Sequence, residues 1–356
     1  GFFDPATNEV LDGAGKVFTG ALSSLAEVVT GDGDDVFHIF DTASTSPTLL
    51  DGADGSDTYI FYSDGSATID AKVEDSGERK LYITDTVIAR SDEGIDSAGT
   101  VNDVVEVTDT MVDFGSGAAT IEYASPGTTG SLLELVVQTL AGLDSVSIAS
   151  SSDSVPVRVD VGNDDDLITI GSNTNGLDEI LGTELSGPDA GPLVLVAGAG
   201  HDVVILDDTA DTDGGSGSLS AFTELRGGGA TTVEVGVVRG FDMAVDIEFE
   251  DAEVLDLRLG SGAETVAIGE ELDFFNVTSS ATAVFTFSGM TLVDTGDGDD
   301  VVNVLRTQDL TQTASSLVSL NVTTAGVNPT NGGAGSSEVV ELQLTEELGY
   351  FVLELD

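Results

Sequence analysis

The chain has no cysteine and no tryptophan, and only 10 of its 356 residues are lysine or arginine, against 65 aspartates and glutamates. The absence of cysteine excludes disulfides, thiolate metal sites and cysteine nucleophiles. With a formal net charge of −55, the chain lacks the clustered basic residues that bind nucleic-acid phosphates. The same charge is repelled by anionic lipid surfaces. We therefore expect no nucleic-acid partner.

Long apolar runs are also missing. The longest uncharged stretches, 274–293 and 310–337, are rich in Ser, Thr, Asn and Gly, and their apolar residues alternate with polar ones. A membrane-spanning helix needs about 20 predominantly apolar residues. These stretches are more typical of strands with a polar face, and we expect no direct membrane insertion.

The residues that are present favour an all-β fold. Val, Leu, Ile and Phe occur in alternating runs of four to eight residues, bounded by Gly, Asp, Ser or Thr, which is the pattern of strands joined by turns. Helical periodicity is limited to 21–29 and 177–185. The 40% hydrophobic content argues against a disordered acidic tail, although such a charge opposes compaction unless cations or a saline medium neutralise it.

One pattern recurs along the chain: an alternating apolar strand, a short turn of the G-x-G-x-D type, and another alternating strand. The first copy, at 31–35, reads G-D-G-D-D, and the last, at 296–300, has the same five residues. Related turns begin at Gly162, Gly198 and Gly260. A variant copy lies at 51–57. A constant strand context around one turn indicates a structural unit that is used repeatedly.

The chemistry of these turns points to calcium. Glycine permits positive φ angles and lets backbone carbonyls turn inward, while carboxylates supply the hard oxygen ligands that Ca²⁺ prefers. Since Gly and Asp are also ordinary turn residues, the same turns are compatible with no bound ion. The candidate ligands are Asp32, Asp34, Asp35, Asp54, Asp57, Asp164, Asp166, Asp202, Glu264, Asp297, Asp299 and Asp300.

The turns resemble the RTX, or haemolysin-type, calcium-binding repeat, whose nonapeptide is G-G-x-G-x-D-x-U-x. The match is carried by 31–37, 52–59 and 296–302. The resemblance implies a parallel β-roll with Ca²⁺ between successive turns, and export as part of a toxin, protease, adhesin or surface-layer protein. The copies here are isolated rather than tandem, the turn at 162–166 lacks the second glycine, and Glu264 replaces the aspartate.

We expect one elongated parallel β-solenoid or β-roll-like unit, with tandem β-sandwich modules as the alternative. The chain divides into a β-rich N-terminal region, 1–114, with a charged insertion near 63–113, and a repeat-bearing β region, 115–356.

The leading functional hypothesis is a secreted, acidic, calcium-stabilised structural protein of a prokaryotic cell surface. It would be a subunit of a filament, surface layer or matrix that self-associates through terminal strands such as 339–344 and 350–356. One alternative is an adhesin or ligand-binding module of a larger surface protein, and a cell-surface glycan is a candidate partner. The other is an extracellular polysaccharide lyase or epimerase-like enzyme, but the basic residues are few, and neither His38 nor His201 has a nearby serine or cysteine. We expect no enzymatic activity and no catalytic residues.

Overall fold

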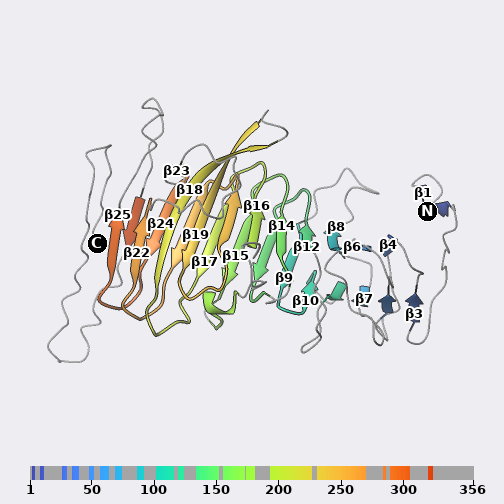
Figure 1. Cartoon of the computed structure of the whole chain (residues 1–356), viewed down its shortest axis with the longest axis horizontal. Helices are drawn as coiled ribbons and strands as arrows, with labels where there is room; N and C mark the ends of the chain where they lie inside the picture. Colours follow the sequence, from blue (N-terminus) through green and yellow to red (C-terminus); the bar gives the residue numbers. More distant parts are fainter. Residues whose placement is uncertain are drawn as a thin grey trace.

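The computed structural model contains β-strands as almost its only regular secondary structure (Figure 1). It describes residues 2–4, 9–11, 26–29, 34–39, 48–51, 57–63, 69–73, 86–91, 102–115, 119–123, 134–151, 155–172, 174–180, 193–226, 231–269, 284–285, 289–304 and 320–323. In this part of the chain the sole helical element is a 3-10 turn, η1 (Leu177–Glu179). The all-β prediction is confirmed, while Ala26–Val29, within a stretch of helical periodicity, forms a strand. None of the described helices is long and apolar enough to span a membrane.

Two large open sheets contain nearly all the strands. Sheet 1 contains β3 (Ala26–Val29), β5 (Thr48–Asp51), β7 (Ile69–Val73), β9 (Val104–Val107), β10 (Met111–Asp113), β11 (Ala119–Glu122), β13 (Ser145–Ile148), β15 (Leu167–Gly171), β17 (Val203–Asp207), β21 (Val254–Arg258), β24 (Met290–Asp294) and β26 (Leu320–Thr323).

Sheet 2 contains β4 (Val36–Ile39), β6 (Thr58–Ser63), β8 (Thr86–Ser91), β12 (Glu134–Gln138), β14 (Val157–Asp160), β16 (Leu193–Val196), β18 (Ser216–Arg226), β19 (Thr231–Gly240), β20 (Ile247–Glu250), β22 (Thr265–Ile268) and β25 (Val301–Val304), with β23 (Val284–Phe285) beside β18. A separate hairpin pairs β1 (Phe2–Asp4) with β2 (Glu9–Leu11).

The chain alternates between the two sheets, and most strands pair in parallel with the strand that follows two places later. In sheet 1, β13 pairs with β15 and β15 with β17; in sheet 2, β14 pairs with β16. The registers are regular, so that Val146 lies beside Ile168, and Ile168 beside Val204. Equivalent residues of successive turns therefore lie in rows along the long axis of the molecule (Figure 1).

Two antiparallel excursions interrupt this alternation. Between β7 and β13, sheet 1 contains β11, β10 and β9, while sheet 2 has only β12 between β8 and β14. Between β16 and β22, sheet 2 contains β20, β19 and β18, while sheet 1 has only β17 between β15 and β21. The first excursion therefore has three strands in sheet 1 and one in sheet 2, and the second has the reverse. The two excursions compensate, because sheets 1 and 2 each place six strands between the β7/β8 and β21/β22 levels.

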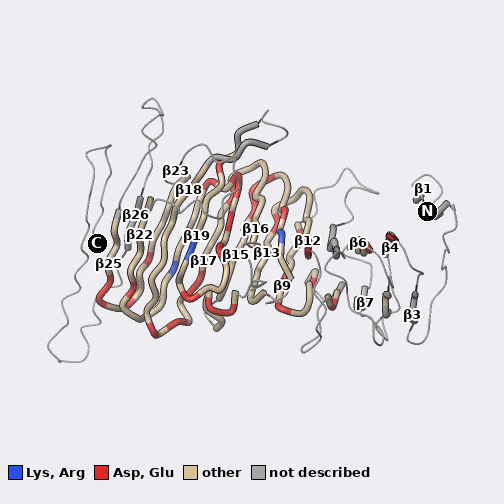
Figure 2. Tube along the Cα trace, in the orientation of Figure 1, with Lys and Arg blue, Asp and Glu red and all other residues tan. Residues whose placement is uncertain are grey.

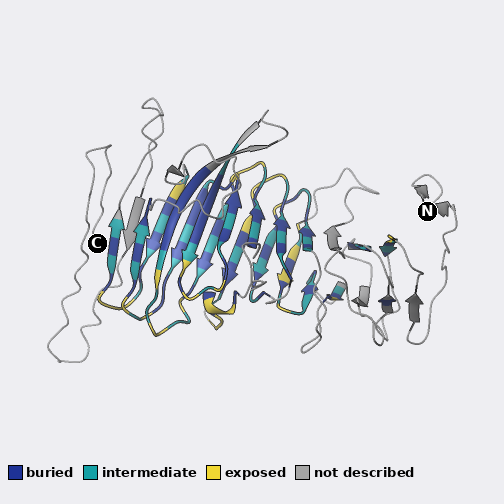
Figure 3. Cartoon of the chain, in the orientation of Figure 1, coloured by how far each residue is buried: buried dark blue, intermediate teal, exposed yellow. Residues whose placement is uncertain are grey.

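The core lies between the sheets and follows from the period-two alternation of the strands. The inward side chains of β13 and β15 in sheet 1, and of β12 and β14 in sheet 2, belong to one buried cluster. Their outward neighbours are intermediate or exposed, which gives the striped pattern of Figure 3. Because each buried Val, Leu or Ile contributes about 1.5–3 kcal/mol, the stack is held together by this continuous cluster.

Candidate functional site

Three turns in the middle of the chain lead from sheet 2 into sheet 1 and stack on one another. We call central turns the segments 139–144, 161–166 and 197–202. The Ala199 N–H donates to the Gly162 carbonyl oxygen at 2.9 Å. A Cβ added at Gly198, where φ is +93°, would lie 1.8 Å from that same oxygen. Glycine at this position is therefore required by close stacking of the backbone.

A carboxylate stands at the end of each central turn, immediately before the next strand of sheet 1. With the equivalent residues on either side it forms the central row: Asp103, Asp144, Asp166, Asp202 and Glu253. From Asp144 onward, each carboxylate accepts the backbone N–H of the preceding member of the row. The donors Asp103, Asp144 and Asp166 lie 2.8 Å from the Oδ1 of the next member, and the Asp202 nitrogen lies 2.7 Å from Glu253 Oε2.

The second carboxylate oxygen has no such role in the centre of the row. Asp166 and Asp202 are 3% and 1% exposed. Their Oδ2 atoms are buried and have no hydrogen-bond partner. A buried ionised carboxylate without a partner is costly, so it takes up a proton or a cation. The central row therefore presents buried oxygens that are chemically unsatisfied.

The pKa values express the same imbalance. Burial raises the pKa of Asp166 to about 7, and neighbouring Asp144 and Asp202 raise it further against the hydrogen bond from the Asp144 N–H. Burial likewise raises the pKa of Asp202 to about 6, with Glu253 adding to the effect. Burial also raises the pKa of Asp144, although the adjacent Thr139 hydroxyl lowers it. These carboxylates lie in an environment that favours neutralisation.

A second set of turns leads from sheet 1 into sheet 2 near the end of the described chain. We call C-terminal turns the segments 259–264 and 295–300. Their final residues, the C-terminal pair Glu264 and Asp300, repeat the arrangement: the Glu264 N–H donates to Asp300 Oδ1 at 3.0 Å. Glu264 Oε2 and Asp300 Oδ2 are buried and unpartnered. Burial, followed by the adjacent Asp300 carboxyl, raises the pKa of Glu264.

The same backbone-to-carboxylate hydrogen bond occurs near the N-terminal end of the described residues. The Asp35 N–H donates to Asp57 Oδ1 at 2.9 Å, and both residues immediately precede strands of sheet 2, β4 and β6. Asp57 is 1% exposed. Equivalent carboxylates therefore occur near both ends of the described chain as well as in its centre.

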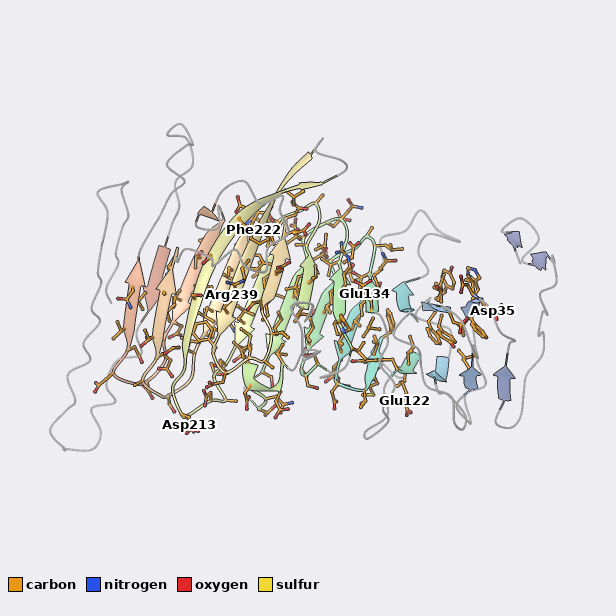
Figure 4. All side chains as sticks on the ribbon, viewed as in Figure 1. Asp35, Glu122, Glu134, Asp213, Phe222 and Arg239 are labelled. Carbon is orange, nitrogen blue, oxygen red and sulfur yellow. The ribbon has the colours of Figure 1, made fainter. Side chains whose placement is uncertain are left out.

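The central row and the C-terminal pair lie at opposite ends of the strands. Every strand of sheet 1 except β10 runs in the same direction, so turns that enter this sheet and turns that leave it are at opposite strand ends. The central row enters sheet 1, whereas the C-terminal pair leaves it. Figure 2 shows acidic residues at both ends of the strands. Figure 4 labels Asp213, which lies in another turn that leaves sheet 1. The turns that end in a buried carboxylate therefore move from one end of the strands to the other at each of the two excursions.

The predicted ligands fall into two groups. The last acidic residue of each turn is the one that belongs to a row: Asp35, Asp57, Asp166, Asp202, Glu264 and Asp300. The other acidic residues of the turns, namely Asp34, Asp164, Asp297 and Asp299, are exposed to solvent. Asp32 and Asp54 lie outside the described residues.

Asp103, Asp144 and Glu253 were not among the predicted ligands, because their turns lack the pair of glycines. Their signal is the residue that follows at the second position: Val105, Val146 and Leu255 are buried, as in the D-x-U part of the repeat. In the turn at 139–144, Leu140 adopts a positive φ of 73° without being glycine. A search for an acidic residue two places before a buried strand position would have found all three.

Comparison with known proteins gives no match to a family model, a curated protein or a solved structure. The fit of a cation must therefore be judged from the donors themselves. No group of three or more His, Cys, Asp or Glu side chains in the described residues is arranged to hold a metal ion. Asp144, Asp166 and Asp202 instead offer successive hard oxygens whose Oδ2 atoms are buried and unpartnered, which fits a calcium ion that takes its remaining ligands from carbonyls and water.

Proposed function

We propose that this chain is a calcium-stabilised structural protein of a prokaryotic cell surface, with the two sheets forming a β-solenoid of the β-roll kind. The observation that carries the proposal is the set of three successive buried carboxylates, Asp144, Asp166 and Asp202, whose Oδ2 atoms have no hydrogen-bond partner. A divalent cation supplies the missing positive charge and so offsets part of the −55 net charge. Calcium would then be part of the fold, as a metal that binds only the folded chain stabilises it.

The residues that would hold the ions are those of the central row and the C-terminal pair. Asp166 and Asp202 are adjacent in the row, each with one oxygen committed to a backbone N–H and the other unpartnered. The exposed Asp164, Asp297 and Asp299 add negative potential at the mouths of the turns, which attracts cations from solution. Calcium in these positions would neutralise repulsion between successive levels of the stack.

A structural role in an assembly is supported by the way the sheets end. Within the described residues, β25 and β26 are the last strands at one end, and β3 and β4 are the last at the other. Strands that end a sheet expose unpaired backbone groups that recruit further strands. We propose that copies join end to end in the parallel order of the sheets, as a filament, layer or matrix outside the cell. The predicted terminal strands at 339–344 and 350–356 lie outside the described residues.

Thermal unfolding of the whole chain tests the calcium part of the proposal. We expect the midpoint to rise strongly when millimolar CaCl₂ is added to chelator-treated protein, because each site loaded at 100 times its Kd stabilises the fold by about 2.7 kcal/mol. The double variant Asp166→Asn, Asp202→Asn should lose much of this rise. Glu106→Gln, which changes an exposed outward position of β9, should keep all of it.

Sodium chloride at matched ionic strength is the decisive comparison. An equal rise in NaCl and CaCl₂ would show that the acidity reflects screening in a saline medium, and would contradict the calcium proposal. The assembly part is tested by electron microscopy and light scattering with calcium and with EGTA, where only monodisperse particles in both conditions would contradict it.

A further inference from the structure

One position inside each turn lies five residues before the row carboxylate. It is occupied by Thr139, Val161 and Ala197 in the central turns, and by Leu259 and Thr295 in the C-terminal turns. All five residues are buried, and Thr139 and Thr295 are wholly so. At Thr139 the hydroxyl lies next to the Asp144 carboxyl. Thr295 occupies the equivalent position in the turn that Asp300 ends.

The two threonines differ in what their hydroxyls do. The Thr139 hydroxyl donates to the Val161 carbonyl oxygen at 3.0 Å. The Thr295 hydroxyl has no hydrogen-bond partner, although Thr295 is 0% exposed. Most buried polar side chains in native structures are hydrogen-bonded, so this one needs an explanation.

Two further unsatisfied atoms accompany the Thr295 hydroxyl, one in its own turn and one in the neighbouring turn. Asp300 Oδ2 ends that turn, and Glu264 Oε2 belongs to its neighbour, joined to it by the bond from the Glu264 N–H to Asp300 Oδ1. Asp300 and Glu264 are 1% and 3% exposed. Two carboxylates and a hydroxyl are hard oxygen donors, and their formal charge matches that of a divalent cation.

We propose that Thr295, Glu264 and Asp300 form a divalent-cation site of their own, in which the Thr295 hydroxyl is a neutral ligand. The inference rests on the proposed function for its calcium chemistry. It adds the Thr295 hydroxyl as a ligand and separates this site from those of the central row. The central row lies at the opposite end of the strands. The site is therefore loaded independently of Asp166 and Asp202.

Calcium titration by calorimetry of the whole, chelator-treated chain tests this assignment. Thr295→Val removes the hydroxyl while nearly conserving shape, and should weaken one class of ion by about tenfold or more, leaving the remaining ions unchanged. Thr295→Ser restores a hydroxyl and should restore the affinity. Thr139→Val is the matched control, since its hydroxyl donates to the Val161 carbonyl and lies in a central turn; it should leave the affinity of the C-terminal ion class unchanged.

The outcomes separate this inference from the proposed function. If the wild-type chain binds calcium but Thr295→Val and Thr139→Val titrate alike, the Thr295 ligand is wrong while the proposed function stands. If Asp300→Asn weakens every ion, including those of the central row, the independence of the site is wrong. If the wild-type chain binds no calcium, both proposals fail. Loss of one ion class in Thr295→Val, with recovery in Thr295→Ser, supports the site.

Discussion

The central turns and the C-terminal turns use the same local device at opposite ends of the strands. In both, a buried carboxylate at the end of one turn accepts the backbone N–H of its counterpart in the preceding turn, at 2.8 Å from the Asp166 nitrogen to Asp202 and 3.0 Å from the Glu264 nitrogen to Asp300. They differ in the sheet they enter, and the one threonine at the inner position of each set differs in its hydroxyl, which donates to a carbonyl at Thr139 but has no partner at Thr295.

The same turn motif is therefore compatible with either end of the strands. The antiparallel excursion in sheet 2 separates the two regions, and the carboxylates move to the opposite strand ends there. Because the excursions lie in opposite sheets and compensate in strand number, the stack continues past both. The motif forms acidic turns that stack on one another, and the position of the excursions determines at which end of the strands these turns lie.

The largest expected effect comes from glycine substitutions that disrupt turn stacking, one in each region. A Cβ added at Gly198 or Gly296 would lie 1.8 Å from the carbonyl oxygen of Gly162 or Gly260, at φ values of +93° and +70°. We expect Gly198→Ala and Gly296→Ala each to lower the free energy of unfolding by about 3 kcal/mol or more, measured by urea denaturation.

Gly215→Ala is the control for this pair, because its Cβ would have no neighbour nearer than 3.4 Å. It should change stability by less than about 1 kcal/mol. A mild effect at Gly296 combined with a severe one at Gly198 would show that the C-terminal turns are not stacked as the central turns are.

The next effect concerns the row carboxylates. Asp202→Ala and Asp300→Ala each leave a buried N–H, that of Asp166 or Glu264, without its acceptor, which costs about 1–3 kcal/mol. Asparagine keeps an acceptor oxygen and should recover most of this loss in calcium-free buffer. It should not recover the stabilisation by calcium. If alanine and asparagine behave alike without calcium, the backbone hydrogen bond contributes little at that turn.

Much of this fold was predictable from local chemistry. The alternation of Val146 and Ile148, or of Val204 and Leu206, places one face of each strand in the core, and the acidic glycine turns mark where many strands begin. The excursions were not predictable, because β10 and β19 have the same alternating composition as parallel strands. The buried carboxylate of each turn has a local signal, since Asp166 lies two places before the buried Ile168 and Asp164 does not, but its hydrogen bond to the turn before it has none.

The third effect concerns Asp208, a buried aspartate that belongs to neither row and lies in the turn from β17 to β18. Its Oδ1 accepts the Leu177 N–H of η1 at 2.7 Å. Burial raises its pKa from 3.8 to about 6, with Asp211, Asp178 and Asp242 adding to the rise. The folded chain then binds more protons here than the unfolded chain, so this group destabilises the fold progressively as pH rises from about 4 to about 6.

Asp208→Asn keeps the acceptor and removes the titration. We expect the variant to match the wild type near pH 4 and to exceed it above pH 6. A shift of roughly two pKa units at about 1.4 kcal/mol each sets an upper limit of about 3 kcal/mol. Urea denaturation across this range measures the difference. A constant difference between the two proteins at all pH values would show that Asp208 does not titrate with folding.

The smallest effect compares ion pairs on the outer faces of the two sheets. Arg258 and Arg239 each lie 2.7 Å from a carboxylate, that of Asp256 in sheet 1 and that of Asp246 beside sheet 2. Exposed pairs of this kind contribute about 0–1 kcal/mol. Arg258 also lies beside Asp207 and Asp294 on its neighbouring strands, so Arg258→Ala leaves three carboxylates without a cation.

We therefore expect Arg258→Ala to cost more stability than Arg239→Ala at low salt, within about 1 kcal/mol, by chemical denaturation. The gap should close in about 1 M NaCl, where the screening length falls to about 3 Å. A gap that persists at high salt would assign the contribution of Arg258 to packing of its aliphatic stem on sheet 1 rather than to its charge.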